Sequence, residues 1–286
     1  NTTGIARHIT VQAILPELQK RQINILSHGS TGRGNDQVRF QLATNMLNPN
    51  IQIYAPWRDQ KFLDRFGGRK EMINFCQQND LPITATHEKP YSTDANLLGL
   101  THEAGRLESL KTPADFITPG MGCHPKDAPD QVEYFTISFE QGIPTAVNGS
   151  PVTPLAAIDQ ANRIGGRNAV GIGTHVVENR FVGIKSRGVY ESPGMELIGK
   201  CYEYLLQLIL DRRARRVFDQ VSMQIAEQVY EGYWFAPVTK SLLESIKPFT
   251  KLASGKITVS LYKGNITFHS ATGSPHSLYS EETASM

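Results

Sequence analysis

Two hydrophobic spacings alternate along the first 84 residues. The helical spacing of Ile5, Ile9 and Ile14 predicts a helix that Pro16 ends or kinks. Strand-like and helix-like segments then follow in turn: a strand over 23–26, a helix over 37–47, a strand over 51–55, a helix over 60–78 and a strand over 81–84. This alternation is typical of a parallel α/β sheet, in which ligand sites form beyond the carboxyl ends of the strands.

The pattern changes in the remainder of the chain. Residues 111–130 contain four prolines and predict a long connection. Other segments predict a hairpin over 131–147 turning at Gln141-Gly142, a helix over 154–164 ended by Gly165-Gly166, a strand over 176–184, a helical stretch over 195–231 broken near Asp211, and a hairpin over 257–268 turning at Lys263-Gly264. We therefore expect an α/β domain over 1–78 and an α+β domain over 79–286.

The composition is that of a soluble globular protein, since 40% hydrophobic and 20% charged residues exclude a disordered chain. The 29 basic and 27 acidic side chains nearly cancel, so charge gives no argument for nucleic acid or an anionic membrane. No apolar run is long enough to span a membrane. Three cysteines without a C-x-x-C pair indicate neither a disulfide framework nor a zinc site, and a cytoplasmic setting fits best.

A glycine-rich turn at 27–36 is the most informative segment. Its glycines allow close approach of the backbone to a ligand, and the helix that follows offers free N–H groups to an anion. The order G-x-x-G-x-G matches neither the Rossmann fingerprint nor a Walker A loop. Asn35, Asp36 and Arg39 can point at one spot and could grip a zwitterion such as an amino acid. Alternatively, Asn35 or Asp36 caps the helix and Arg39 pairs locally.

Two further polar segments have both functional and ordinary interpretations. Residues 90–96, which include Ser92, and residues 101–105 could fix a polar ligand or could simply form turns. Glu178 and Arg180 share one face of the predicted strand and could form a functional site or a surface pair. Cys123-His124 and the other histidines lack the spacing of a metal site, so we expect no protein-bound metal.

Several motifs occur in the order found in one known family. They are Ser27-His28-Gly29, Thr31-Gly32, Gly34-Asn35-Asp36-Gln37-Val38-Arg39-Phe40, Ala55-Pro56-Trp57-Arg58, Pro90-Tyr91-Ser92, Glu103-Ala104-Gly105, Val177-Glu178-Asn179-Arg180-Phe181-Val182-Gly183, Lys185-Ser186-Arg187-Gly188-Val189-Tyr190-Glu191, Leu261-Tyr262-Lys263-Gly264-Asn265 and Ser277-Leu278-Tyr279-Ser280. These motifs cover nearly the whole chain, and with them the sequence resembles the argininosuccinate synthase family.

The resemblance implies an ATP-dependent ligase of arginine biosynthesis. In that reaction ATP transfers AMP to the ureido oxygen of L-citrulline with release of pyrophosphate, and the amino group of L-aspartate then displaces AMP to give argininosuccinate. The resemblance also implies the second half of an α/β nucleotide-binding domain of the adenine nucleotide α-hydrolase-like type, followed by an α+β synthetase and multimerisation domain. The other expectations are ATP with Mg²⁺, no prosthetic group, a cytoplasmic homotetramer with subunit contacts over 195–231, and no nucleic-acid or membrane partner.

The resemblance assigns roles residue by residue. Gly29 matches an ATP-contacting glycine. Thr31, Asn35 and Asp36 match aspartate-binding positions, and Asp36 is the candidate for orienting or deprotonating the aspartate amine. The positions that match citrulline contacts are Asn35, Arg39, Ser92, Thr101, Glu178 and Tyr190. Thr101 stands where many members have serine, and the hydroxyl is kept.

Three departures from the family pattern qualify these roles. The S-G-G-L-D-T-S type pyrophosphate loop is missing, so the chain is expected to begin within the nucleotide-binding domain and to be inactive alone. It stops at Met286, where relatives continue into a tail. Thr3 matches a family threonine, but Gly4 falls where a citrulline-contacting serine is common. The alternatives are a related ATP pyrophosphatase amide ligase, which should lack the 177–190 motifs, and a non-catalytic amino-acid-binding paralogue without the ATP loop.

Overall fold

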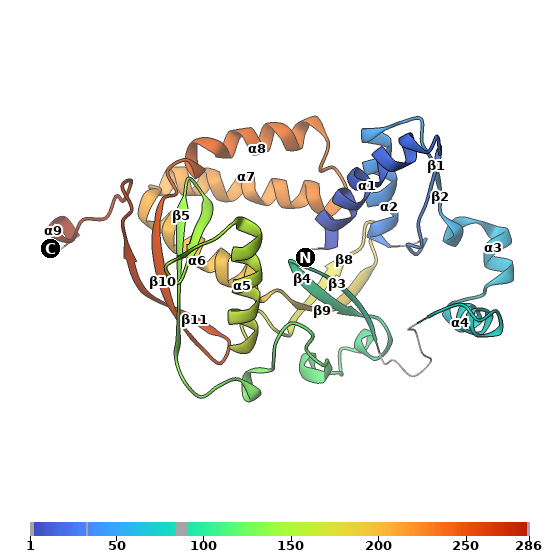
Figure 1. Ribbon diagram of the computed structural model, residues 1–286, viewed down its shortest axis with the longest axis horizontal. Helices are drawn as coiled ribbons and strands as arrows, with labels where there is room; N and C mark the ends of the chain where they lie inside the picture. The colour runs from blue at the N-terminus through green and yellow to red at the C-terminus, as the bar shows by residue number, and fades with distance from the viewer. Residues whose placement is uncertain (1–2, 33, 84–90, 285–286) are drawn as a thin grey trace.

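The computed structural model describes residues 3–32, 34–83 and 91–284. Arg33, Thr84 and Pro90, which belong to the segments predicted above, lie outside these ranges. The molecule is elongated, with the N-terminal helices at one side, a small antiparallel sheet in the middle and a larger sheet at the other side (Figure 1). No helix in the described ranges is long and apolar enough to cross a membrane.

The N-terminal part contains the predicted parallel pair of strands. β1 (Ile25–Ser27) lies beside β2 (Gln52–Tyr54), and the helices of this part are α1 (Thr3–Lys20), α2 (Asn35–Leu47), α3 (Gln60–Arg65) and α4 (Arg69–Gln78), with a 3-10 turn at η1 (Pro56–Arg58). The carboxyl end of β1 leads through the glycine-rich turn into α2. This strand, turn and helix unit confirms the prediction.

Two N-terminal predictions need correction, and of the two outcomes predicted at Pro16, an end or a kink of the helix, the end does not occur. Helix α1 continues past Pro16, because Gln12, whose carbonyl loses its helical partner there, is exposed and water can solvate it. The helix predicted over 60–78 is two helices, since the poor helix formers Gly67 and Gly68 separate α3 from α4. Residues 81–83 form no strand, and they pair with none of the strands in the described ranges.

The middle sheet is antiparallel, with strand order β3-β4-β9-β8. Its strands are β3 (Ser92–Asn96), β4 (Gly99–Glu103), β8 (Thr174–Asn179) and β9 (Lys185–Glu191). The strand predicted over 176–184 is therefore the first arm of a hairpin that turns at 180–184, where Gly183 has a φ of 81°. Arg180 lies in this turn and not on the strand.

The larger sheet, with order β11-β10-β5-β6-β7, carries the main hydrophobic core. Its strands are β5 (Glu133–Glu140), β6 (Ile143–Val147), β7 (Ser150–Pro151), β10 (Gly255–Tyr262) and β11 (Asn265–Thr272). Both predicted hairpins are confirmed, and their turns at Gln141-Gly142 and Lys263-Gly264 have the positive φ values of tight hairpin turns. Helices α5 (Pro154–Arg167) and α6 (Pro193–Ile209) cover this sheet.

The glycine pair inside α5 does not end the helix as predicted. A Cβ at Gly165 would lie 2.9 Å from the carbonyl oxygen of Pro193, so the glycine is needed for close packing of α5 against the start of α6. The predicted break near Asp211 is confirmed, because Asp211 caps the helix α7 (Arg212–Glu231) through two backbone N–H groups.

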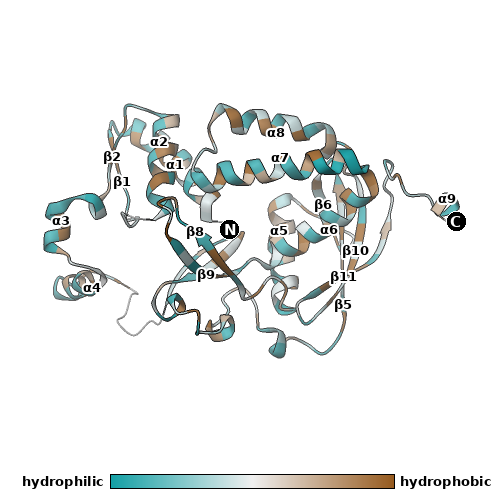
Figure 2. Ribbon diagram, turned by 180° about the vertical axis from the view of Figure 1, so that it is seen from behind, coloured by the Kyte–Doolittle hydropathy of each residue, from teal (hydrophilic) through white to brown (hydrophobic). Residues whose placement is uncertain are grey.

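A further helix, α8 (Pro237–Thr250), packs antiparallel to α7 and was not predicted (Figure 1). Hydrophilic and hydrophobic residues alternate along both helices (Figure 2). The connection over 111–130 is confirmed, and the remaining short elements are η2 (Gly105–Glu108), η3 (Ala114–Phe116), η4 (Pro125–Asp127) and α9 (Glu281–Ala284). Helix α1 contacts α2, α7, β3 and β4, which brings the N-terminal part against the middle sheet.

Candidate active site

A polar cavity of about 450 Å³ lies where the first turns of α1 and α2 meet one face of the middle sheet. Eight of the nine predicted site residues line it: Gly29, Thr31, Asn35, Asp36, Arg39, Thr101, Glu178 and Tyr190. Ser92 pairs with Glu103 in the β3–β4 register, so it shares the cavity-facing side of the sheet but does not line the cavity. Thr3 also lines it, whereas Gly4 packs against Val229 of α7.

The start of α2 positions three of these residues without using them as helix caps. Helix α2 begins at Asn35, and its N-cap residue is Gly34, which makes no side-chain capping bond. The capping alternative for Asn35 and Asp36 is therefore wrong. The local pairing of Arg39 is present, since its Nη1 donates to Asp36 Oδ1 at 2.8 Å. The side chains of Asn35 and Asp36 therefore make their contacts with groups around the cavity and not with the backbone of the first turn.

Asp36 is held between two guanidinium groups. Arg39 approaches Oδ1, and Arg7 of α1 donates from Nε to Oδ2 at 2.9 Å. Arg7 also bonds Asp94 of β3. This chain of charges joins α1, α2 and the middle sheet, and it fixes the Asp36 carboxylate as a negative centre facing the cavity.

Arg39 is buried, with 3% of its surface exposed, yet one of its donors is unused. Its Nε donates to the carbonyl oxygen of Tyr230 at 2.8 Å, and its guanidinium lies 5.0 Å from the centre of the Tyr230 ring. Its Nη2 has no hydrogen-bond partner in the part of the chain that the structure describes. A buried, fixed guanidinium with a spare donor is suited to bind a carboxylate.

Asn35 joins the cavity to the β8–β9 turn. Its Nδ2 donates to the Tyr230 hydroxyl at 2.8 Å, and that hydroxyl donates to the carbonyl oxygen of Asn179 at 2.7 Å. The backbone N–H of Phe181 donates to Asn35 Oδ1 at 2.6 Å. Tyr230 therefore fixes both the amide of Asn35 and the turn that carries Arg180.

The cavity-facing side of the middle sheet supplies hydroxyl and carboxylate groups. Burial, Glu178 and Glu103 raise the pKa of Tyr190, so its hydroxyl stays protonated and can donate. Burial also raises the pKa of Glu103, against the opposing charge of Arg180. The turn places Arg180 in the cavity lining together with Glu178, so neither belongs to a simple surface pair.

The lining carries four carboxylates and three guanidinium groups: Asp36, Asp94, Glu103, Glu178, Arg7, Arg39 and Arg180. Both signs of charge lie close together in this lining, which suits ligands that carry an ammonium and a carboxylate, as amino acids do. Within the described ranges, no group of three or more acidic, histidine or cysteine residues is arranged to hold a metal ion.

Four lining or supporting residues were not singled out from the sequence. Asp94 and Glu103 lie in polar segments that were noted, but their charges could not be told from those of ordinary turns. Arg7 and Tyr230 had no local signal, because Arg7 is 29 residues from Asp36 and Tyr230 is 195 residues from Asn35. Only the three-dimensional contact shows that they belong to the site.

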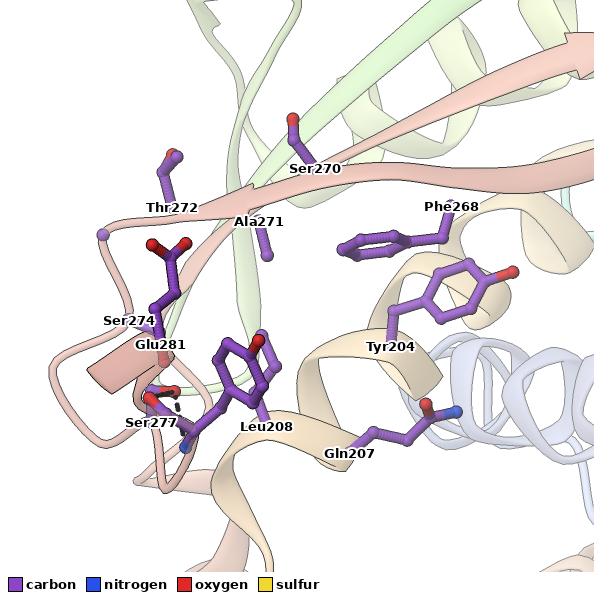
Figure 3. A pocket seen from close by; sticks show the side chains of 12 residues that line it. Tyr204, Gln207, Leu208, Phe268, Ser270, Ala271, Thr272, Ser274, Ser277 and Glu281 are labelled. Carbon is purple, nitrogen blue, oxygen red and sulfur yellow. Dashed lines mark hydrogen bonds between the residues drawn. The ribbon is translucent and has the colours of Figure 1, made fainter. Parts of the chain in front are cut away.

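A larger cavity, of about 820 Å³, lies far from these charges, between α6, β11 and the C-terminal segment (Figure 3). The rings of Tyr204 and Phe268 form part of its wall and meet edge to face at 5.2 Å. Glu281 supplies the one carboxylate among its lining residues. The larger cavity lacks the set of charged side chains that lines the smaller one, so the smaller polar cavity is the candidate active site.

Comparison with known proteins identifies the family of the chain. Residues 1–82 match the family model described as the arginosuccinate synthase N-terminal HUP domain, and residues 91–286 match the arginosuccinate synthase C-terminal domain. The argininosuccinate synthase of Rhodopirellula baltica is 45% identical over 285 residues, which cover 99% of this chain and 70% of that protein.

Two other relatives agree. The argininosuccinate synthase of Thermotoga maritima is 39% identical over 289 residues, covering 99% of this chain and 70% of that protein. The protein of the same name from Desulfitobacterium hafniense is 38% identical over 282 residues, covering 99% of this chain and 69% of that protein. The chain belongs to the argininosuccinate synthase family.

Proposed function

We propose that the polar cavity is where an argininosuccinate synthase reaction joins L-citrulline to L-aspartate with ATP as the energy source. The observation that carries this proposal is the Asp36 centre, which Arg7 and Arg39 hold opposite Glu178 and Tyr190 in one cavity. ATP transfers AMP to the ureido oxygen of citrulline and pyrophosphate leaves. The amino group of aspartate then attacks the activated carbon, and AMP departs with the former ureido oxygen.

Citrulline is assigned to the wall formed by Arg39, Glu178 and Tyr190. The spare Nη2 donor of Arg39 can bind the α-carboxylate, and Glu178 can bind the α-ammonium group. The protonated hydroxyl of Tyr190 offers a further donor. Asn35, Thr101 and Ser92 complete the proposed set, Ser92 from the edge of the same face of the sheet.

Aspartate is assigned to the glycine-rich turn and the start of α2. Thr31 and Asn35 offer hydroxyl and amide groups, and Asp36 orients or deprotonates the attacking amine. No side chain acts as a covalent nucleophile, since the adenylate already provides the leaving group. Alignment of the two amino acids and stabilisation of charge therefore supply most of the catalysis.

ATP is assigned to Gly29, which follows β1. A Cβ at this position would meet nothing within 4 Å, so the backbone is open to a nucleotide. Mg²⁺ enters with the ATP phosphates as part of the substrate. The match of residues 1–82 to a HUP domain supports an adenine nucleotide α-hydrolase-like fold for the first part, with a synthetase and multimerisation domain over 79–286.

We also infer a cytoplasmic homotetramer. Exposed apolar side chains on α7, among them Met223 and Val217, support a subunit contact over 195–231. Size-exclusion chromatography with light scattering tests the oligomeric state. A mass four times that of the polypeptide is expected, and the mass of a monomer would contradict the homotetramer.

Labelled citrulline tests the reaction. With ¹⁸O in the ureido group, the AMP that the full-length enzyme forms from ATP, citrulline and aspartate should carry the label, because AMP departs with that oxygen. Unlabelled AMP would contradict attack on a citrullyl-AMP intermediate. The names of the relatives support an enzyme over the non-catalytic amino-acid-binding alternative.

A further inference from the structure

Gly188 occupies the centre of β9, in the middle of the sheet that forms one wall of the cavity. It pairs with Val176 of β8 on one side and with Glu103 of β4 on the other. Ser186 and Tyr190, two residues before and after it on the same strand, both line the cavity. Because side chains alternate along a strand, a side chain at position 188 would also face the cavity.

The backbone does not require glycine at this position. Gly188 is not among the residues with positive φ, so it has an ordinary strand conformation that any residue adopts. Glycine inside a strand weakens the sheet and often marks a place where another group approaches closely. The reason for this glycine must therefore lie in its surroundings.

The approaching group is the side chain of Tyr190. A Cβ built at position 188 would lie 2.6 Å from the Tyr190 hydroxyl oxygen, 2.7 Å from Cζ and 2.8 Å from Cε2. Such distances are well inside van der Waals contact. The ring of Tyr190 thus lies back along β9, over the space that the missing side chain leaves.

The orientation of the Tyr190 ring determines the position of its hydroxyl group. Tyr190 pairs with Thr174 and Thr101, while Glu178 pairs with Ser186, four residues further back along β9. A ring standing away from the sheet would leave its hydroxyl distant from Glu178. A ring lying over Gly188 carries the hydroxyl towards Ser186 and Glu178.

We propose that Gly188 is a positioning residue for citrulline, because the absence of its side chain lets Tyr190 lie along β9 and share the ligand with Glu178. This inference rests on the proposed function, since it takes Tyr190 and Glu178 as citrulline contacts. Any larger residue at 188 would lift the ring and displace the hydroxyl from the ligand.

The test is a double-mutant cycle in the purified full-length enzyme. Gly188→Ala should weaken citrulline binding by about tenfold, the loss expected when a hydrogen bond to the ligand is removed, while the KM for ATP changes by less than about twofold. In the Tyr190→Ala background, the same substitution should change citrulline affinity by less than about twofold, because the ring that it displaces is gone. Equilibrium dialysis with labelled citrulline gives the affinities.

Gly67→Ala is the matched control, because position 67 is an exposed site between α3 and α4 where a Cβ meets nothing closer than 3.8 Å. It should leave citrulline affinity unchanged. Equal losses from Gly188→Ala in both backgrounds, or no loss in the first, would overturn the inference while leaving the proposed function intact. Full citrulline affinity in Tyr190→Ala alone would instead overturn the proposed site, and the inference with it.

If Gly188→Ala folds poorly, melting temperatures of the single and double variants provide a second test of the contact between position 188 and the Tyr190 ring. Since the clash involves the Tyr190 side chain, Gly188→Ala with Tyr190→Ala should melt at a higher temperature than expected from the sum of the two single changes. Additive losses of stability would contradict the proposed contact.

Discussion

The middle and the larger antiparallel sheets use the same strand geometry for different purposes. In the larger sheet, alternate side chains of β5 and β10, such as Phe135 and Ile257, are completely buried against α5 and α6. In the middle sheet, the corresponding face carries Thr101, Glu103, Glu178 and Tyr190 towards a cavity. Burial of apolar surface therefore stabilises one sheet, while the other presents polar groups that a ligand can complete.

Unpartnered polar atoms show the same difference. Among the described residues, eight have buried side-chain polar atoms without a partner, and seven of them lie in the N-terminal part and the middle sheet: His8, His28, Gln37, Arg39, Thr44, His102 and Arg187. The eighth, Ser274, follows β11 of the larger sheet. In the larger sheet and its covering helices, buried side chains are almost all apolar. Unsatisfied buried groups cost stability, and among these residues Arg39 lines the cavity, where a bound ligand can supply the missing partner.

The largest expected effect is on stability in the larger sheet. Phe135→Ala removes a fully buried ring and should lower the free energy of unfolding by about 3–5 kcal/mol. The KM for citrulline should not change in the folded enzyme, because the ring lies far from the cavity. Urea denaturation and steady-state kinetics measure the two. Tyr134→Ala, at an exposed position of the same strand, is the control and should cost much less.

The next effect is on binding. Arg39→Ala should lower kcat/KM for citrulline by about a hundredfold, because it removes the proposed carboxylate contact and leaves Asp36 with one guanidinium partner fewer. The KM for ATP should stay within about threefold. Arg163→Ala, which breaks an exposed ion pair with Asp159 on α5, should change neither value. A similar loss from both variants would contradict the site.

The cavity region should also be the more sensitive of the two to acid. Burial, with the charge of Arg39, lowers the pKa of His8 to about 4 from an ordinary 6.5. Between these values the unfolded chain binds a proton that the folded chain does not, so stability falls as the pH drops from 6.5 towards 4. Between pH 7 and pH 5 this contribution is about 2 kcal/mol.

Urea denaturation at the two pH values measures this contribution. His8→Gln should lose that part of the pH dependence. An unchanged slope in the variant would show that the acid sensitivity comes from other groups.

The smallest effect concerns the support of Asn35. Tyr230→Phe removes the hydroxyl that joins Asn35 to the carbonyl of Asn179. The KM for aspartate should rise by about fivefold, while the free energy of unfolding should change by less than about 1 kcal/mol. Tyr134→Phe, on the larger sheet, is the matched control. Equal KM values for wild type and Tyr230→Phe would show that this bridge does not serve the ligand.

Local patterns were sufficient to predict elements that local chemistry determines. The strand, turn and helix around Gly29 and the turn at Lys263-Gly264 follow from residue spacing and glycine positions, and so does the break at Asp211. The helix end predicted at Gly165-Gly166 is wrong, because close packing against the start of α6 requires these glycines and they do not mark the end of α5. Helix α1 continues past Pro16, because solvent can satisfy the carbonyl that the proline leaves unpaired.

The same division holds for the site. Asn35, Asp36 and Arg39 are neighbours on one helix, so their convergence was predictable from spacing. Assignment of Glu178 and Tyr190 needed the resemblance to a family, because the strand pairings that bring them together join distant segments. Arg7 and Tyr230 became apparent only through contacts between separate elements. Contacts of this kind depend on the whole fold and leave no local pattern in the sequence.

The most direct test of the central claim is citrulline binding to Glu178→Gln. The substitution keeps the size of the side chain and removes the negative charge proposed to bind the α-ammonium group. Citrulline affinity, measured by calorimetry, should fall by at least about tenfold, while the KM for ATP stays within about twofold. Unchanged citrulline affinity, or an equal loss for citrulline and ATP, would contradict the assignment of the cavity to citrulline.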